Sequence, residues 1–408
     1  MKSDKSEVQA MRGFKRTEVG LIPRDWDCIE FGAICELSKN RINPILNRID
    51  YKCIELEHLS QDSGILLEYI SSNNTLSQKN IFKKGDVLFG KLRPYLKKFW
   101  HAHFNGVCST EIWVLKAKNY IDDSFLFQVV RSERIIEAAN ISIGTKMPRA
   151  EWKTVAETKI PLPATKAEQT AIATALNDAD ILITALGQLL AKKRAIKQGA
   201  TQELLRPKIG WEEKKLGEII KNIQLGGNYK NEENITEYPL IKMGNIQRGF
   251  IVLNKVDYIQ GNKFREKDRL KYGDILFNTR NTLDLVGKVA IWKDELPIAY
   301  FNSNIMRIEF KNEYISSNFF MNSLFNTDYL IKNLKTIAIG TTSVAAIYTR
   351  DLLNIDISFP KFPEQISIAQ ILADMDAEIE LLEQKLEKQK QVKQGMMQVL
   401  LTGKVRLV

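Results

Sequence analysis

An internal duplication constrains the fold of this chain more than any other feature of its sequence. The segment EQTAIATALNDAD (168–180) returns as EQISIAQILADMD (364–376), and seven of the thirteen positions carry the same residue 196 places later. The likeness continues through the residues that follow each copy. A chain of 408 residues is long enough for two or three domains with their own cores. The repeat therefore predicts two copies of one structural unit within a single chain.

The repeated segments themselves predict two long helices. Apolar residues recur alternately three and four places apart, which is the heptad seam of a coiled coil. The predicted seam residues are Ile172, Leu176, Ile183, Leu186 and Leu190 in the first copy and Ile368, Leu372, Met375, Ile379, Leu382 and Leu386 in the second. Each helix would be about 60 Å long at 1.5 Å per residue. Because neither helix can bury its apolar stripe alone, we expect the two to pack together, antiparallel.

Local signals mark the ends and the interior of these helices. Thr165 and Glu168 form a candidate capping box at the first helix start. Gly199 and Gly395 lie inside the helices at matched positions, which predicts either close backbone packing or a local break.

The regions before each long helix repeat more weakly. GDVLFG (85–90) matches GDILFN (273–278), and STEIWVL (109–115) matches NSNIMRI (302–308). Both regions read as several β-branched and aromatic strands, one helix and a last strand that runs into the long helix. The predicted single helices are 123–139 and 316–335.

The predicted fold is therefore mixed α/β (α+β), with two similar domains, two long antiparallel coiled-coil helices and a pseudo-two-fold internal duplication. The predicted boundaries are 1–163 for the first domain, 164–206 for the first helix, 207–362 for the second domain and 363–408 for the second helix.

The charge distribution favours a polyanionic partner. The net charge is +10, and residues 1–165 and 206–363 each carry five more basic than acidic groups, whereas the repeated helices are nearly neutral. Basic domains favour nucleic acid. The polar N-terminal residues and the absence of an apolar run of about 18 residues predict neither a secretory signal nor a membrane span. Four cysteines without a CxxC pair predict reduced thiols in the cytoplasm.

A search for catalytic motifs finds none. His101 and His103 would share one face of a predicted strand, but a metal site there would need further ligands. The sequence has no GxxxxGK[ST] loop for a nucleoside triphosphate, no Asn/Asp-Pro-Pro-aromatic tetrapeptide of amino-methyltransferases and no glycine-rich cofactor loop after a strand. We therefore expect a binding protein with no catalytic residues, metal or cofactor of its own.

Polar and basic loops at matching places in the two domains are the candidate DNA-binding elements. Lysine would contact phosphates, arginine can pair with guanine, and asparagine or glutamine can pair with adenine. The predicted DNA-binding residues are Lys91, Arg93, Lys97, Lys98 and Lys146 in the first domain and Lys242, Asn245, Gln247, Arg248, Asn278, Arg280, Asn281, Thr341 and Thr342 in the second. Each loop alone could be an ordinary solvated turn. Their recurrence with changed residues favours two different DNA readers on one scaffold.

The order of these motifs resembles the specificity subunit of type I restriction–modification enzymes over essentially the full length. The resemblance rests on GD-[IV]-LF followed by a basic or polar tip, GKVAIW (287–292), an IGT turn, strands ending in IPLP and ISFP, and EQ opening each long helix. The first domain departs from the family pattern, since it has GKLRPYLKK where the second has NTRN and GKVAIW.

The resemblance implies a non-catalytic subunit whose two target-recognition domains read the halves of a split, asymmetric site in double-stranded DNA. It implies that the paired helices dock two methyltransferase subunits, and that motor-nuclease subunits complete the enzyme. S-adenosylmethionine, ATP and Mg would then belong to those partners. Two alternatives from other classes are a free-standing DNA-binding regulator and a coiled-coil protein scaffold.

Overall fold

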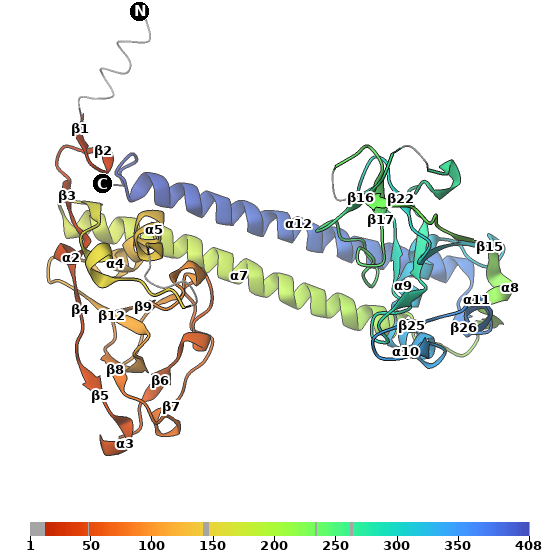
Figure 1. Cartoon of the computed structure of the whole chain (residues 1–408), viewed down its shortest axis with the longest axis horizontal. Helices are drawn as coiled ribbons and strands as arrows, with labels where there is room; N and C mark the ends of the chain where they lie inside the picture. Colours follow the sequence, from red (N-terminus) through yellow and green to blue (C-terminus); the bar gives the residue numbers. More distant parts are fainter. Residues whose placement is uncertain (1–12, 48, 142–146, 233–234, 262–263, 408) are drawn as a thin grey trace, which may run out of the picture. The chain divides into compact units, whose positions relative to one another are not determined.

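The computed structural model describes residues 13–47, 49–141, 147–232, 235–261 and 264–407. The chain forms two compact units, one made of Met1–Gln188 and Gln384–Val408 (unit 1) and the other of Leu189–Glu383 (unit 2). The two long helices are α7 (Lys166–Leu204) and α12 (Phe362–Leu400) (Figure 1). Because the division falls inside both helices, each unit contains one domain and part of each helix.

Unit 1 is built on two sheets. The first has the order β10 (Phe99–His101), β9 (Val87–Gly90), β12 (Ile112–Ala117), β4 (Cys35–Leu37), and the second β5 (Arg41–Ile42), β8 (Lys79–Phe82), β11 (Gly106–Ser109), β6 (Lys52–Ile54), β7 (Ile70–Ser71). Two strand pairs accompany them: β1 (Phe14–Thr17) with β2 (Gly20–Pro23), and β3 (Asp27–Glu30) with β13 (Lys159–Leu162). The shorter helices are α2 (Phe31–Ile34), α3 (Pro44–Asn47), α4 (Asp123–Val130), α5 (Glu133–Asn140) and α6 (Trp152–Ala156).

Unit 2 repeats this plan. Its sheets have the orders β15 (Ile220–Leu225), β23 (Ile305–Phe310), β19 (Ile275–Asn278), β21 (Val289–Ile291) and β16 (Asn231–Glu232), β18 (Asp257–Ile259), β17 (Pro239–Ile241), β22 (Tyr300–Phe301). Smaller sheets join β14 (Glu212–Lys215) to β26 (Asp356–Phe359), and β20 (Arg280–Asn281) through β25 (Ala345–Ala346) to β24 (Ile339–Gly340). The shorter helices are α8 (Leu216–Ile219), α9 (Asn318–Phe325), α10 (Asp328–Thr336) and α11 (Thr349–Leu353).

The matched motifs occupy matched strands. The two GD-x-LF segments form β9 and β19, and each pairs antiparallel with the strand of the STEIWVL or NSNIMRI motif, β12 or β23. Each unit also has one parallel pair in its second sheet, β11 with β6 and β22 with β17. The internal duplication is therefore present in the topology of the sheets as well as in the helices.

The predicted single helices 123–139 and 316–335 are each two helices, which corrects the prediction. The break follows α4 in unit 1 and α9 in unit 2, and Ser132 and Thr327 are the N-caps of the second helices. The Thr327 hydroxyl accepts a hydrogen bond from the Leu330 amide at 3.4 Å. Serine and threonine favour such caps because their side chains compete with the helical backbone for its hydrogen bonds.

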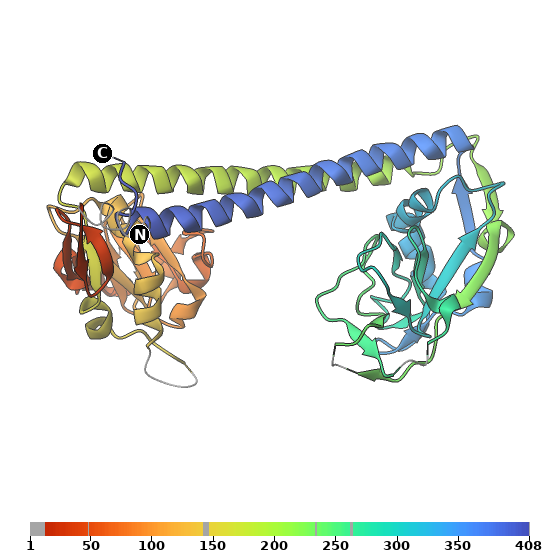
Figure 2. The same ribbon diagram turned by 90° about the horizontal axis from the view of Figure 1, so that it is seen from above.

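The start of each long helix is buried against its own domain. In unit 1, Ile172 and Leu176 of α7 join the core that contains Phe125 of α4 and Leu400 of α12. In unit 2, Ile368 and Leu372 of α12 join a core with Phe320, Phe325 and Leu205. In Figure 2 each domain lies to one side of the helix segments of its unit.

Burial along the predicted seam is graded. Leu186 and Leu190 of α7 are also buried. The other seam residues are half-buried: Ile183, Met375, Ile379, Leu382 and Leu386. Gly199 and Gly395 lie in continuous helix, and a Cβ at either would meet no atom within 4 Å. The structure thus contradicts both expectations for these glycines, the close backbone packing and the local break.

The repeated EQ dipeptide anchors each long helix to its domain. Gln169 accepts a hydrogen bond from the Asp122 amide at 2.9 Å and donates to the carbonyls of Tyr120 and Pro163 at 3.4 and 3.5 Å. Gln365 is its equivalent: it accepts from the Ser316 amide at 2.9 Å and donates to the carbonyls of Tyr314 and Pro360 at 2.8 Å each. Both side chains are buried, so these backbone groups depend on them for hydrogen bonds.

The glutamate of the first EQ does not complete the predicted capping box. The Glu168 amide does donate to the Thr165 hydroxyl at 3.2 Å. The Glu168 carboxylate, however, accepts from the Trp26 indole at 3.1 Å and from the Arg406 guanidinium at 2.7 and 2.8 Å. This contact links the first turn of α7 to the segment that follows α12, because Arg406 lies in that segment. None of the helices in the described part of the chain is long and apolar enough to cross a membrane.

Candidate nucleic-acid interface

In unit 1 the candidate residues lie on the segment between β9 and β10. Arg93 and Lys97 both adopt left-handed backbone conformations, with φ of 51° and 50°. Residues other than glycine rarely adopt such conformations, and strained positions of this kind cluster at functional sites. Arg93 and Tyr95 are exposed. The side chains of Lys91 and Arg93 have no hydrogen-bond or ion-pair partner within the described ranges, so they are available to an external anion.

Two other lysines of this segment are engaged within unit 1. The Lys98 ammonium donates to the Leu56 carbonyl at 2.5 Å. Lys97 lies 3.7 Å from the Asp62 carboxylate. Lys146 falls in 142–146, outside the described residues. Lys91 and Arg93 are therefore the principal available cations of the segment between β9 and β10 in unit 1.

In unit 2 the equivalent segment, between β19 and β21, pairs with a second loop, the 339–346 hairpin. Arg280 and Asn281 form β20, which pairs with Ala346 and Ala345 of the 339–346 hairpin. Thr341 and Thr342 are exposed at the turn of that hairpin, and the Thr342 carbonyl accepts from the Leu283 amide at 3.2 Å. The structure therefore brings Arg280, Asn281 and the two threonines together, although 60 residues separate them in sequence.

Two predicted residues of unit 2 are used inside the domain. Asn245 is buried; its side-chain oxygen accepts from the Lys242 amide at 2.9 Å, and its side-chain nitrogen donates to the carbonyls of Val252 and Lys255 at 2.9 and 2.8 Å. The Lys242 ammonium lies 2.6 Å from the Asp257 carboxylate. The Asn245 side chain is therefore committed to the fold of the domain and is not a DNA-binding residue, and the charge of Lys242 is already paired.

Gln247 and Arg248 lie beside Lys288, a residue that is not among the predicted DNA-binding residues. Lys288, in GKVAIW, donates to the Gln247 side-chain oxygen at 2.8 Å and is only 9% exposed. Burial lowers the pKa of Arg248, and burial together with the charge of Arg248 lowers the pKa of Lys288. Asn278 lies in the same part of the sheet and is fully buried. A lysine within an apolar strand sequence was the signal that could have identified this position.

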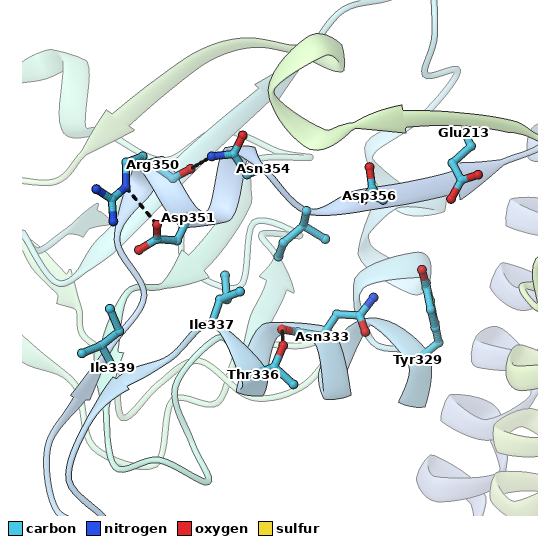
Figure 3. Close-up of a pocket in the computed structure, with 11 residues that line it drawn as sticks. Glu213, Tyr329, Asn333, Thr336, Ile337, Ile339, Arg350, Asp351, Asn354 and Asp356 are labelled. Atoms are coloured by element: carbon cyan, nitrogen blue, oxygen red, sulfur yellow. Dashed lines mark hydrogen bonds and ion pairs between the residues drawn. The ribbon is translucent and has the colours of Figure 1, made fainter.

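A groove of about 590 Å³ in unit 2 has a different character. It lies between α10, α11 and the β14–β26 pair (Figure 3). Arg350 at its edge forms an ion pair with Asp351 at 3.0 Å, and Glu213 and Asp356 also line it. Three carboxylates against one arginine do not favour a polyanion. The groove is therefore not part of the candidate DNA surface.

The chain belongs to the family described as type I restriction modification DNA specificity domain, which matches residues 23–196 and 208–391. The MjaVIII specificity subunit of a type I restriction enzyme of Methanocaldococcus jannaschii is 26% identical over 97% of this chain and 96% of its own. The EcoDI specificity subunit of Escherichia coli is 27% identical over 39% of this chain and 36% of its own.

Solved structures share the fold. A chain from a study of complex assembly and conformational transition of the type I R-M system superposes with a TM-score of 0.62, 19% identity and coverage of 94% of this chain and 99% of the other. The S subunit of a type I restriction-modification system from M. genitalium superposes with a TM-score of 0.56, 16% identity and coverage of 92% and 96%. The protein is thus a type I restriction–modification specificity subunit with two DNA specificity domains.

Proposed function

We propose that this chain is a non-catalytic subunit that reads a split, asymmetric site in double-stranded DNA with its two target-recognition domains. The observation that carries the proposal is the pair of equivalent hairpin tips, β9–β10 and β19–β21, which share a strand framework and differ in their polar residues. A conserved framework with different tips is suited to two different half-sites. Lysines would position the phosphates, and Arg93, Arg280 and Asn281 are candidates for base contacts.

The proposal includes partner subunits. Two methyltransferase subunits that use S-adenosylmethionine would dock on the α7 and α12 segments, and motor-nuclease subunits that use ATP and Mg would join them in the cytoplasm. Apolar side chains exposed on these helices support docking, because a partner subunit would bury them. The exposed apolar residues are Ile181, Leu182, Leu189 and Ile196 on α7 and Ile366, Ile371, Leu381 and Val392 on α12.

A binding selection tests the proposal. The full-length chain, alone and with a methyltransferase subunit from the same source, would be offered random duplex DNA, and the bound fraction would be sequenced. We expect two short, unlike half-sites with a fixed unread gap, enriched mainly when the partner is present. A single contiguous or palindromic motif bound without a partner would instead identify a free-standing regulator, and no enrichment would favour a protein scaffold.

The helices are also proposed to set the gap between the half-sites. Inserting four residues, about one turn or 6 Å, into either α7 or α12 should lengthen the gap by one or two base pairs. The measurement is the same selection with the insertion variant, after its helical content has been verified. An unchanged gap in a folded variant would refute this role of the helices.

A further inference from the structure

A cluster of polar side chains in unit 2 is assembled from two segments that are distant in sequence. The Asn278 amide donates to the Lys288 carbonyl at 2.9 Å, and the Gly287 amide donates to the Asn278 carbonyl at 3.0 Å. Asn278 therefore faces both Gly287 and Lys288 in a β-bulge, with Gly287 at φ 73°, next to the last paired residues, Phe277 and Val289. The bulge holds Lys288 against the end of β19, next to Asn278.

The turn 247–250 completes this cluster. The Gln247 amide donates to the Phe250 carbonyl at 2.9 Å, and Ile246 pairs with Ile251 at the base of the turn. The Lys288 ammonium bonds to the Gln247 side chain, and Arg248 follows on the same turn. We call Gln247, Arg248, Asn278 and Lys288 the donor cluster.

The side-chain oxygens of the donor cluster each already accept one hydrogen bond. The Asn278 side-chain oxygen accepts from the Arg280 amide at 3.2 Å, and the Gln247 side-chain oxygen accepts from Lys288. The side-chain nitrogen of Gln247 donates to the Gly244 carbonyl at 3.4 Å. Among the described residues, the groups of the cluster that have no partner are donors: the remaining N–H groups of Lys288, the guanidinium of Arg248 and the side-chain nitrogen of Asn278.

The Asn278 nitrogen is the most informative of these groups. Asn278 is 0% exposed, and its side-chain nitrogen is buried without a hydrogen-bond partner among the described residues. A buried N–H without a partner is costly in a native protein, and an acceptor supplied by a ligand would remove that cost. Because its oxygen is held by the Arg280 amide, the side chain cannot turn over to present an acceptor instead.

The charges of the cluster point to the same kind of ligand. Arg248 and Lys288 lie close enough for the charge of Arg248 to lower the pKa of Lys288, and burial lowers the pKa of both groups. Neither cation forms an ion pair with a carboxylate in the part of the chain that the structure describes. Two partly buried cations beside an unpaired N–H are stabilised when a ligand supplies electron-rich acceptors.

We infer that the donor cluster binds a group of DNA that carries only hydrogen-bond acceptors. Two groups of duplex DNA offer several acceptors side by side without a donor, namely the O6/N7 edge of guanine in the major groove and a backbone phosphate, whereas thymine offers only O4 beside its methyl group. Adenine and cytosine each present an amino donor in the major groove, which two cations and the Asn278 N–H cannot accept. This inference rests on the proposed function, and it adds a specific residue, Lys288, and a specific ligand chemistry to the second domain.

The test compares wild-type and variant full-length protein, each with the methyltransferase subunit, in the random-duplex selection and in binding at several salt concentrations. Lys288→Met removes one cation, and Asn278→Asp replaces the free donor with an acceptor. Lys293→Met is the matched control, because Lys293 is an exposed lysine two residues beyond β21. Lys288→Arg keeps the donors and should keep the wild-type behaviour. Thermal unfolding verifies that each variant is folded.

The two sources of acceptors give different results. If the ligand is guanine, one position of one half-site loses its guanine preference by roughly 5- to 150-fold in Lys288→Met, and Asn278→Asp shifts that position towards adenine or cytosine. If the ligand is a phosphate, affinity falls for every sequence alike, and the slope of log affinity against log salt decreases in magnitude by about 0.9.

The outcomes also separate this inference from the proposed function. Wild-type protein that selects a split site, with folded Lys288 and Asn278 variants that match the Lys293 control in both sequence preference and salt slope, would overturn the donor cluster alone. A wild-type protein that selects no split site would overturn the proposed function and, with it, this inference.

Discussion

The two units contain the same ion pair at equivalent positions of the repeat, in very different surroundings. Asp180 of α7 pairs with Lys393 of α12 at 2.5 Å in unit 1, and Asp376 of α12 pairs with Lys197 of α7 in unit 2. Each residue of one pair lies 196 places from its equivalent in the other. The side chain of Lys393 is 9% exposed, whereas that of Lys197 is 30% exposed.

A residue of the domain explains the difference. In unit 1, Arg131 at the end of α4 donates to Asp180 at 2.5 and 3.1 Å and lies over the rings of Phe99 and Phe127. In unit 2 the end of α9 carries Asn326, which instead donates to the carbonyls of Val289 and Asn322. One carboxylate is thus shared by two cations in unit 1 and serves one cation in unit 2.

The protonation of the shared site follows from this arrangement. Burial raises the pKa of Asp180, but hydrogen bonds and charge from Arg131 and Lys393 outweigh it and hold the pKa below its ordinary value. Burial and the nearby Arg131 lower the pKa of Lys393 to about 8, against the attraction of Asp180. The Asp180–Lys393 pair of unit 1 therefore carries a desolvation cost. The equivalent Asp376–Lys197 pair of unit 2 avoids most of this cost because it is more exposed to water.

The largest expected difference between the units comes from removing the carboxylates. Asp180→Ala leaves two buried cations without a partner and should destabilise unit 1 by about 3–5 kcal/mol. Asp376→Ala, the matched control, should cost under about 1 kcal/mol because its partner is solvated. Amide hydrogen exchange along α7 and α12, read by mass spectrometry, measures both. Equal losses of protection in the two variants would show that burial does not separate the pairs.

A second pair of variants tests where the units are alike. Gln169→Leu and Gln365→Leu each leave one backbone amide and two carbonyls without their side-chain partner, and each should cost about 1–3 kcal/mol. Because the contacts match, the losses of stability should be similar. The measurement is urea unfolding, with exchange protection used to assign each loss to its unit. A clear inequality would mean that water replaces the glutamine in one unit.

The lowered pKa of Lys393 gives a pH dependence to unit 1. Between about pH 8 and the ordinary lysine pKa of 10.5, the folded state binds fewer protons than the unfolded state, so stability rises with pH. From pH 7 to pH 9 this contribution amounts to about 1 kcal/mol. Asp180, whose pKa is lowered, stays ionised over this range. Lys393→Met should remove the rise, measured as the difference between variant and wild type in urea unfolding at the two pH values.

The control for this pH effect is Lys197→Met in unit 2. Its pH profile should parallel that of wild type, because Lys197 is more exposed. A rise that persists in Lys393→Met would assign the effect to another group.

The smallest effects are expected at the two matched glycines. Gly199→Ala and Gly395→Ala should each stabilise the helix by about 0.5–1 kcal/mol, since nothing lies within 4 Å of the added methyl group. Thermal unfolding measures this change. Stabilised variants that nevertheless lose binding to the methyltransferase subunit would show that the glycines allow the close approach of a partner, rather than serving the fold.

The sequence alone determined the parts of this protein that depend on local periodicity. The heptad spacing of Ile172, Leu176, Ile368 and Leu372 predicted two long helices, and α7 and α12 are 39 residues each. The repeated GD-x-LF motif predicted equivalent strands in both domains. Such features follow from the 3.6- and 2-residue periods of helices and strands, and these periods can be recognised in a single sequence.

Tertiary structure decided what each polar side chain does. Asn245 and Asn278 are both asparagines of predicted DNA-binding segments, yet one has every polar group bonded inside the domain and the other has a buried N–H without a partner among the described residues. The apolar sequence around Lys288 predicts only a strand. The hydrogen bond from Lys288 to Gln247, 41 residues away in sequence, is visible only in the fold. The physical reason is that hydrogen bonding and desolvation depend on neighbours distant in sequence, whereas helix and strand patterns depend on neighbours along the chain.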